Sequence, residues 1–335
     1  MKIGNLDTRS APFLIAEAGN NHEGDFQVAR RLVEQAAAGK AHCIKFQTFR
    51  TDHYVSSKDR ARYERLKTFE LTLQQFEQLA ALAHDLGLLF ISTPLDLESA
   101  KGLAPFVDAF KIASGDIDFF PLIEKVLGYG KPLIISTGAS SMEKVSATVD
   151  FVRARLGEQT RDKLALLHCV SSYPAPVSEA NLLSIPYMRE AFGVSVGFSD
   201  HTVGTDASTF AVACGAEIIE KHFTLDKNYS SFRDHQLSAD LPEFSQLVRR
   251  IADLRSMLGT RDKRVQPSEA PTEPAIRRSI VAARPMSAGE RIAFTDLTWI
   301  RPRNGMLPGS ENGIVHKRLR RAVQFGEPIL LEDCE

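Results

Sequence analysis

The chain has 335 residues, 43% of them hydrophobic, so it can bury a large core. Its 41 basic and 42 acidic residues are spread through the sequence and give a formal net charge of -1. This balance argues against nucleic acid or an anionic membrane as a partner and favours a small-molecule substrate. There is no apolar signal core and no apolar run of about 18 residues, so we expect a cytoplasmic protein without a membrane span.

Eight short runs rich in β-branched or apolar residues alternate with segments of helical periodicity. Runs this apolar are typical of strands buried on both faces, and eight strand–helix units close a parallel barrel. The sequence therefore predicts a (β/α)8 TIM barrel, with an open, doubly wound sheet as the weaker alternative. The expected strands cover residues 13–18, 42–47, 88–93, 109–114, 132–137, 164–169, 194–199 and 217–223.

Helix-start signals follow several of these strands. Asp25-Phe26 opens the first helix, residues 72–75 resemble a capping box, and residues 140–143 begin a later helix. Residues 48–71 are polar, charged and too many for an ordinary connection. We expect them to form either a segment that covers the substrate or a solvated surface loop.

The composition changes near the end of the predicted barrel, which we assign to residues 1–259. Residues 260–276 are polar and interrupted by proline, as in a linker. Residues 277–335 contain short runs broken by Gly and Pro, which predicts a compact β-rich module. Because so small a unit rarely stands alone, we expect it to dock onto a barrel.

The four cysteines show no CxxC spacing, and three lie inside apolar runs. This pattern argues against a disulfide framework or a structural zinc site. We expect Cys43, Cys169, Cys214 and Cys334 to be buried free thiols in a reducing compartment.

Two histidines stand where apolar runs give way to polar residues, His201 in VGFSDHTVG and His222 in AEIIEKHFT. In a parallel barrel both would point into the mouth at the C-terminal ends of neighbouring strands. A lone histidine is more often a satisfied core imidazole, but two with carboxylates nearby favour a site for Mn, Fe, Zn or Co. Because side chains alternate along a strand, Glu220 shares a face with His222 and Lys221 points the other way.

Other strand ends carry a carboxylate, lysines and hydroxyls. Glu17 closes the first strand, where it could ligate a metal, move protons or simply pair with a lysine. Lysine is seldom buried without a partner, so Lys45 and Lys111 predict an anionic ligand such as phosphate or carboxylate. Each hydroxyl alone is more often a cap or turn residue, and only their repetition indicates an anion cradle. These hydroxyls belong to Thr93, Ser114, Ser136, Ser171, Ser172 and Ser199.

Eight ordered motifs resemble those of the N-acetylneuraminate (sialic acid) synthase family, which includes the pseudaminic and legionaminic acid synthases. They are IAEAGNNHEG, IKFQT, ISTPLD, KIASGD, ISTGAS, LLHCVSSYPAP, VGFSDHTVG and IEKHFTLDK, and the region around TWIRPRNGM resembles the SAF (antifreeze-like) domain of that family. The resemblance covers nearly the whole chain. It implies a TIM barrel followed by a small β-rich SAF domain.

The resemblance also implies an activity. Phosphoenolpyruvate would condense with an N-acetylated amino sugar, either N-acetylmannosamine or a 2,4-diacetamido-2,4,6-trideoxyhexose. Water would add, and C–O cleavage would release phosphate from a nine-carbon 2-keto-3-deoxy sugar acid. A divalent metal, Mn2+ with Mg2+ or Co2+ as alternatives, would be held by His201 and His222 and would polarise the sugar aldehyde. A domain-swapped homodimer follows from the resemblance alone.

Family roles transfer to matching positions in this sequence. The catalytic set is Glu17, Glu220, His201 and His222, with the glutamates orienting or deprotonating water. The residues that match phosphoenolpyruvate contacts are Lys45, Thr93, Lys111, Ser114, Ser136, Ser171 and Ser199. The sugar-side positions are Gln47, Tyr173, Asp234 and Arg301, the last supplied by the SAF domain of a second subunit.

Some positions depart from the family pattern. LDKNYSSFRDH stands where many relatives have LDRNxPGPDH, so we expect the loop from Tyr229 to His235 to be reshaped. Ser171 replaces an asparagine found in some relatives, and RPRNG replaces RPGNG. Two other classes stay open. One is a Schiff-base aldolase with Lys45 or Lys111 as nucleophile, and the other is a non-enzymatic protein whose C-terminal module mediates interaction or ice binding.

Overall fold

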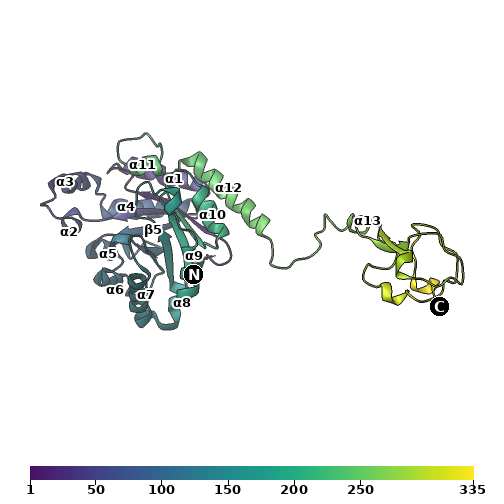
Figure 1. Ribbon diagram of the computed structural model, residues 1–335. Coiled ribbons are helices and arrows are strands. Elements are labelled where there is room, and N and C mark those ends of the chain that lie inside the picture. Colours follow the sequence, from purple (N-terminus) through teal and green to yellow (C-terminus); the bar gives the residue numbers. More distant parts are fainter. The chain divides into compact units, whose positions relative to one another are not determined.

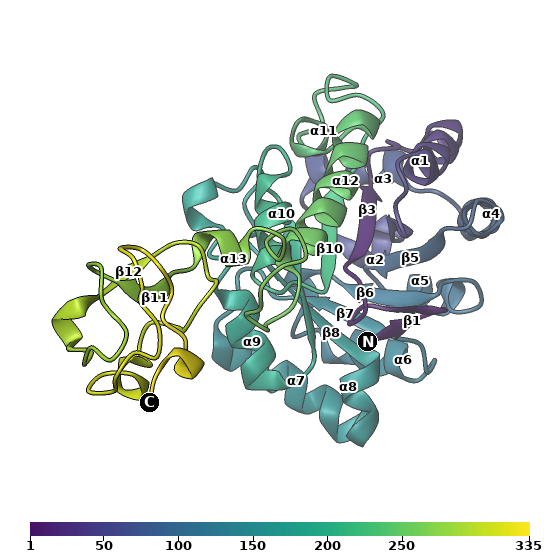
Figure 2. The same cartoon turned by 90° about the vertical axis from the view of Figure 1, so that its right-hand side faces the viewer.

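The computed structural model describes residues 1–335 and contains two compact units, Met1–Gly259 and Thr260–Glu335. The first is a closed barrel of eight parallel strands in the order β10-β3-β4-β5-β6-β7-β8-β9. Helices surround the strands (Figures 1 and 2). The predicted TIM barrel is confirmed, and the open-sheet alternative is wrong because β10 pairs with β3 and closes the sheet.

Each barrel strand overlaps one of the eight predicted runs. The strands are β3 (Phe13–Gly19), β4 (Cys43–Thr48), β5 (Leu89–Pro94), β6 (Ala109–Ile112), β7 (Leu133–Ser136), β8 (Leu164–Cys169), β9 (Ser195–Asp200) and β10 (Ile218–His222).

Helices follow the strands, and three begin at the predicted caps. The Asp25 carboxylate accepts from two backbone N–H groups of the first turn, Thr72 forms a capping box with Gln75, and Ser141 accepts from Lys144. Such caps satisfy N–H groups that would otherwise lack partners. The helices around the barrel are α1 (Phe26–Ala38), α4 (Leu73–Asp85), α5 (Leu97–Leu103), α6 (Phe120–Leu127), α7 (Met142–Leu156), α8 (Thr160–Lys163), α9 (Ser184–Phe192), α10 (Asp206–Ala213) and α12 (Leu241–Leu258).

The barrel core has an outer and an inner part. Leu14 and Ile219 belong to the apolar cluster between strands and helices, whereas Ile15 and Ile218 belong to a separate cluster inside the barrel. Adjacent residues of a strand thus face opposite sides. Glu17 follows Ile15 by two positions and therefore faces inward.

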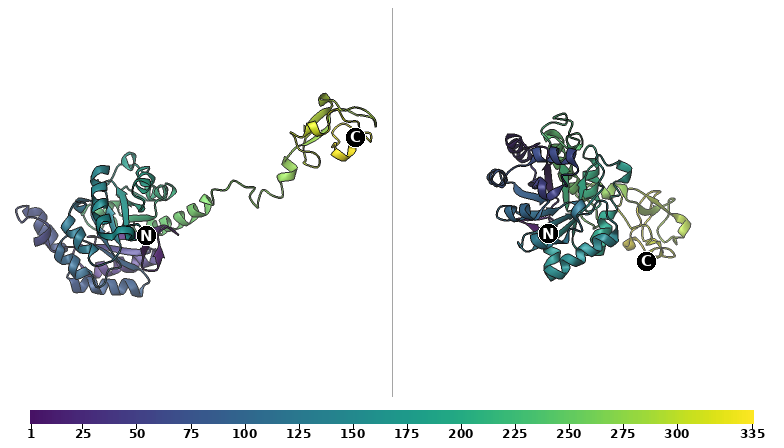
Figure 3. Two further views of the ribbon diagram at one scale, coloured as in Figure 1. Left: turned by 90° about the horizontal axis from the view of Figure 1, so that it is seen from below. Right: turned by 90° about the vertical axis from the view of Figure 1, so that its left-hand side faces the viewer.

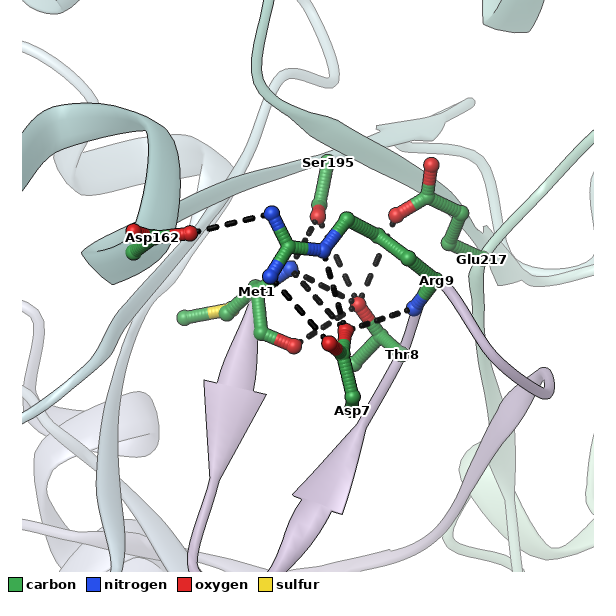
Figure 4. A network of polar contacts seen from close by, with 7 residues as sticks. All are labelled: Met1, Asp7, Thr8, Arg9, Asp162, Ser195 and Glu217. Atoms are coloured by element: carbon green, nitrogen blue, oxygen red, sulfur yellow. Dashed lines mark hydrogen bonds and ion pairs between the residues drawn. The ribbon is translucent and has the colours of Figure 1, made fainter.

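The N-terminal end of the barrel is covered by a hairpin of β1 (Lys2–Ile3) and β2 (Leu6–Asp7). Met1 and Ile3 are fully buried in the inner cluster. The Met1 amine donates to Ser195 Oγ at 2.7 Å, and Arg9 joins Asp7 to Asp162, with 3.0 Å to Asp162 Oδ1 (Figure 4). These contacts hold the hairpin against the strand starts.

Residues 48–71 form two short helices, α2 (Thr51–Tyr54) and α3 (Arg60–Phe69). Leu66 and Phe69 are buried with Phe49 and Leu95 in a small apolar cluster. The segment is thus packed against the barrel and is not a loose loop. It lies at the end opposite the N-terminus (Figures 1 and 3), beside α11 (Asp234–Leu237), which follows β10.

The second unit is built around β11 (Ser279–Ala282), which pairs with β12 (Leu297–Ile300) in an antiparallel sheet. Ile280, Ile292, Val323 and Ile329 are fully buried in its core. The segment predicted as a linker contains the short helix α13 (Glu273–Ile276), whose Glu273 pairs with Arg303 of this unit at 2.6 Å.

All four cysteines are free thiols; three are buried and Cys214 is half-buried. None of the helices combines the length and apolar character needed to cross a membrane.

Candidate functional site

A cavity of about 290 Å3 lies in the barrel mouth. All seven predicted phosphoenolpyruvate-contacting residues line it, together with both glutamates, both histidines, Gln47 and Tyr173. Ser172, which the sequence grouped with the cradle hydroxyls, does not line this cavity, because its hydroxyl donates to the Pro174 carbonyl at 3.1 Å. This space is the inner cavity of the barrel.

Four charges meet on the floor of the inner cavity. Lys45 Nζ lies 2.6 Å from Glu17 Oε2 and 3.5 Å from Glu220 Oε2, and it donates to Thr93 Oγ1 at 3.2 Å. Lys111 Nζ lies 3.9 Å from Glu220 Oε1. All four charged side chains are at least 94% buried, so their mutual attraction is poorly screened by water.

The two glutamates differ in pKa although both are buried. Burial raises the pKa of Glu17, and one close lysine does not offset that cost. Burial would also raise the pKa of Glu220, but Lys111 and Lys45, helped by a 2.8 Å hydrogen bond from Ser199, outweigh it and lower the pKa. Glu17 is therefore the group that can carry a proton at neutral pH, and Glu220 the group that stays ionised.

The Lys111 side of the inner cavity is rich in hydroxyls. Lys111 Nζ donates to Ser136 Oγ at 2.5 Å, and Ser114 Oγ accepts from the Gly138 N–H at 3.0 Å. A Cβ on Gly138 would stand 2.2 Å from Ser171 Oγ, so only glycine lets this backbone approach so closely. The sequence motif ISTG pointed to Ser136 but did not reveal this role of the glycine.

The two histidines form the rim of the inner cavity, with ring centroids 5.5 Å apart. His201 Nδ1 donates to the Val170 carbonyl at 2.7 Å, which leaves Nε2 as an acceptor. His222 Nδ1 is buried and has no hydrogen-bond partner. Burial lowers the pKa of both rings, so both are neutral at pH 7. Two neutral imidazoles fit a divalent metal, with water or substrate completing the ligand set, since His201 Nε2 has only a 3.4 Å contact with Ser199 Oγ.

A larger chamber of about 790 Å3 adjoins the inner cavity. Gln47, Ala113, Tyr173 and His222 line both spaces. One wall of this outer chamber is a face of α3, formed by Arg62, Arg65, Leu66 and Phe69, and the other is the segment 230–234 after β10. The residues on α3 are three or four positions apart and so share one side of the helix.

The two walls touch each other. Phe69 and Phe232 make an edge-to-face contact with ring centroids 5.3 Å apart. The second wall is anchored by Glu23, which accepts from His235 Nε2 at 2.9 Å and also from the Ser230 hydroxyl. The altered loop from Tyr229 to His235 thus forms a fixed part of the outer chamber.

Three of the four predicted sugar-side residues lie around this chamber. Gln47 accepts from Asn20 Nδ2 at 2.9 Å, the Tyr173 ring packs at a tilt against His201 with centroids 4.2 Å apart, and burial raises the pKa of Asp234. Arg301 is an exposed residue of the second unit. The sequence predicts that residues 48–71 cover the substrate or form a surface loop, and that the loop from Tyr229 to His235 is reshaped, but it does not identify the α3 residues or Phe232 as lining a chamber.

The closed barrel, the charged inner cavity and the paired histidines define a barrel enzyme acting on an anionic small molecule. The model of the NeuB family matches residues 32–263, and that of the SAF domain matches residues 277–335. The chain belongs to the NeuB family and carries a SAF domain.

Individual proteins agree with this assignment. The chain is 37% identical to the N,N'-diacetyllegionaminic acid synthase of Legionella pneumophila, covering 100% of this chain and 98% of the relative. An uncharacterised protein of Methanocaldococcus jannaschii is 41% identical over 96% of this chain and 94% of its own length. A crystal structure of N-acetylneuraminic acid synthetase from Leptospira borgpetersenii in complex with citrate is 33% identical, with a TM-score of 0.75 over 81% of this chain and 94% of that one.

Proposed function

We propose that the protein condenses phosphoenolpyruvate with the aldehyde of an acylamino sugar, releasing phosphate and a nine-carbon 2-keto-3-deoxy sugar acid. The observation that carries the proposal is that two spaces adjoin at His222, which lines both of them. The inner cavity has the cations and hydroxyls that an anion needs, and the outer chamber has room for a sugar. The full-length similarity to synthases of this type supports the proposal.

In this proposal phosphoenolpyruvate occupies the inner cavity. Lys45 and Lys111 neutralise its carboxylate and phosphate, and the surrounding hydroxyls donate to the remaining oxygens. The apolar layer below, with Ile15 and Ile218, leaves no space for bulk water. Enclosure in so poor a dielectric strengthens each ion pair with the substrate.

The two glutamates are proposed to act on the attacking water and on a proton. Glu220 is held ionised by the two lysines and can orient the water that adds to C2. Glu17, whose pKa is raised, can hold a proton within reach of Lys45. Ser199 ties Glu220 to β9 and so fixes the carboxylate in place.

His201 and His222 are proposed to hold a divalent metal, Mn2+ in the first instance. Bound there, it would supply Lewis-acid polarisation of the sugar aldehyde. His222 lines both spaces and His201 lines the inner one, so the aldehyde carbon would lie beside C3 of phosphoenolpyruvate while the rest of the sugar extends into the outer chamber.

The test is phosphate release from phosphoenolpyruvate by the metal-loaded protein with each of three sugars: N-acetylmannosamine and the two 2,4-diacetamido-2,4,6-trideoxyhexoses that lead to legionaminic and pseudaminic acids. We expect release that depends on both the sugar and Mn2+, and loss of release on chelation. Absence of release with all three sugars, in folded and metal-loaded protein, would refute this choice of acceptor.

The Schiff-base aldolase is separable by experiment. Lys45 is an unsuitable nucleophile because the nearby carboxylates raise its pKa despite burial. Burial lowers the pKa of Lys111, which leaves it as the only lysine for this alternative. We expect borohydride to trap no adduct with substrate, and a stable adduct on Lys111 would establish the aldolase.

The aromatic wall of the outer chamber predicts an effect of Phe232→Ala. Loss of one apolar contact is expected to lower kcat/KM for a preferred diacetamido sugar by about 10- to 200-fold. The KM for phosphoenolpyruvate should not change, because Phe232 does not line the inner cavity. Asn228→Ala, an exposed residue of the same connection that does not line the outer chamber, is the matched control. An equal fall in kcat/KM for the sugar and for phosphoenolpyruvate would show that Phe232 supports the fold and not sugar binding.

We also propose that Arg301 of one subunit reaches the acyl group of the sugar in the barrel of a second subunit. Arg301→Ala is then expected to raise the KM for the sugar far more than the KM for phosphoenolpyruvate. Mixing Arg301→Ala with His222→Ala protein should restore part of the activity if the residue acts across subunits. Equal effects on both substrates would count against this assignment.

A further inference from the structure

Behind the two histidines lies a buried ion pair that the proposed reaction does not use. Lys221 Nζ is 3.4 Å from Asp200 Oδ2, and the two side chains are 1% and 0% exposed. Asp200 directly precedes His201 and Lys221 directly precedes His222, and the two charged residues are partners in the register of β9 and β10. The pair therefore joins the two strand ends that carry the histidines.

Asp200 uses both of its carboxylate oxygens. Oδ1 accepts from the Thr202 N–H and from Thr202 Oγ1, each at 2.8 Å, and Oδ2 accepts from Ser208 Oγ at 2.6 Å. Capture of an N–H two residues ahead makes the chain turn directly after β9. His201 stands inside that turn, so the carboxylate determines the direction in which its backbone leaves the strand.

Lys221 connects that turn to the neighbouring strand. Besides Asp200, its ammonium donates to the Thr202 carbonyl at 2.5 Å. Lys221 of β10 thus contacts the residues on both sides of His201, which are Asp200 and Thr202. Lys221 is itself followed by His222. Alternation along β10 directs Lys221 outward and His222 inward.

A need for stability does not account for so elaborate an arrangement. Burying an ion pair costs desolvation energy that its attraction barely returns, and apolar replacements of the same size are often as stable. What the pair does supply is a fixed separation between two strand ends. We propose that Asp200 and Lys221 are positioning residues that hold His201 and His222 at the spacing a divalent metal requires.

This inference rests on the proposed metal site. It predicts that Lys221→Met and Asp200→Asn weaken metal binding although neither side chain faces the inner cavity. The expected effect is a rise in the Mn2+ Kd of about 10- to 100-fold, the range for groups that orient metal ligands. Binding is measured by titration calorimetry on the metal-free full-length chain, with no substrate present.

Ser92→Ala is the matched control. Ser92 is fully buried on β5, and its hydroxyl ties β5 to β4 through Thr48 Oγ1 at 2.8 Å and the Phe46 carbonyl at 3.1 Å. It joins neighbouring strands as the ion pair does, but far from the histidines in the strand order. We expect Ser92→Ala to lower Tm without changing the Mn2+ Kd.

The outcomes separate the possibilities. A Mn2+ Kd within twofold of the original in folded Lys221→Met and Asp200→Asn would overturn the inference and leave the proposed function standing, as would an equal rise in Ser92→Ala. If Lys221→Met does not fold, Asp200→Asn decides, because an asparagine Oδ1 still accepts from Thr202. If the unmodified chain binds no Mn2+, or binds it no more tightly than His222→Ala does, the metal site and this inference both fail.

Discussion

His201→Ala and His222→Ala are each expected to abolish Mn2+-dependent phosphate release while leaving the barrel folded. Each change removes one of two neutral imidazoles on the rim of the inner cavity. With only two histidines available, loss of either should weaken Mn2+ binding by more than the ~100-fold upper range for groups that merely orient ligands. The measurement is phosphate release at saturating substrates, with calorimetry for Mn2+ and circular dichroism for folding.

His168→Ala is the control for these variants. His168 lies on β8 of the same barrel, but its Nε2 bonds to the Ala180 carbonyl at 2.9 Å and it does not line the inner cavity. We expect its loss to affect stability and to leave the Mn2+ Kd unchanged. A double variant without His201 and His222 that remained active and metal-loaded would refute the assignment.

Lys45→Met is expected to be the most destabilising single change in the inner cavity. It leaves Glu17 without a cation and Glu220 with only Lys111 at 3.9 Å. Removing one partner from a buried ion pair costs about 3–5 kcal/mol of unfolding free energy. Glu17→Gln in the same chain should recover part of that loss, because the charge left without a partner is then gone. Urea unfolding of the single and double variants measures the coupling between the residues.

The cost of Lys45→Met should depend on pH. Lys45 lowers the pKa of both glutamates, so its loss raises both in the folded state. A carboxyl group whose folded pKa exceeds its unfolded value makes stability fall as pH rises through that interval. The deficit should therefore be larger at pH 8 than at pH 5. A deficit independent of pH would mean that packing and not charge is responsible.

Much of the inner cavity could be predicted from the sequence because the C-terminal ends of all the parallel strands of a barrel lie at the same end. Once eight apolar runs are read as parallel strands, Lys45, Lys111 and Ser199 must lie at one end of the barrel. Alternation then separates Glu220 from Lys221, and the structure places these two side chains on opposite faces. The helix caps Asp25 and Thr72 could also be predicted, because a cap acts on backbone groups within one helical turn of its own position.

The outer chamber could not be predicted in the same way. The contact between Phe69 and Phe232 joins residues far apart in the chain, and each lies well beyond the end of the strand that precedes it. Residues 48–71 showed too little apolar periodicity to distinguish a packed segment from a solvated loop. Its packing depends on a small apolar cluster in which Leu66 and Phe69 are buried with Phe49 and Leu95. Ser172 was misplaced because a strand end specifies alternation only while the strand continues, and β8 ends at Cys169.

The four buried charges of the inner cavity have a thermodynamic consequence. Two lysines face two glutamates, of which Glu17 can carry a proton, so the empty site is neutral or weakly positive. An anion that binds alone is repelled by the glutamates, and a divalent cation that binds alone is repelled by the lysines. Each ligand offsets the charge that the other brings, so the two affinities should rise together. By reciprocity, any factor by which phosphoenolpyruvate strengthened the proposed metal binding would equal the factor by which the metal strengthened phosphoenolpyruvate binding.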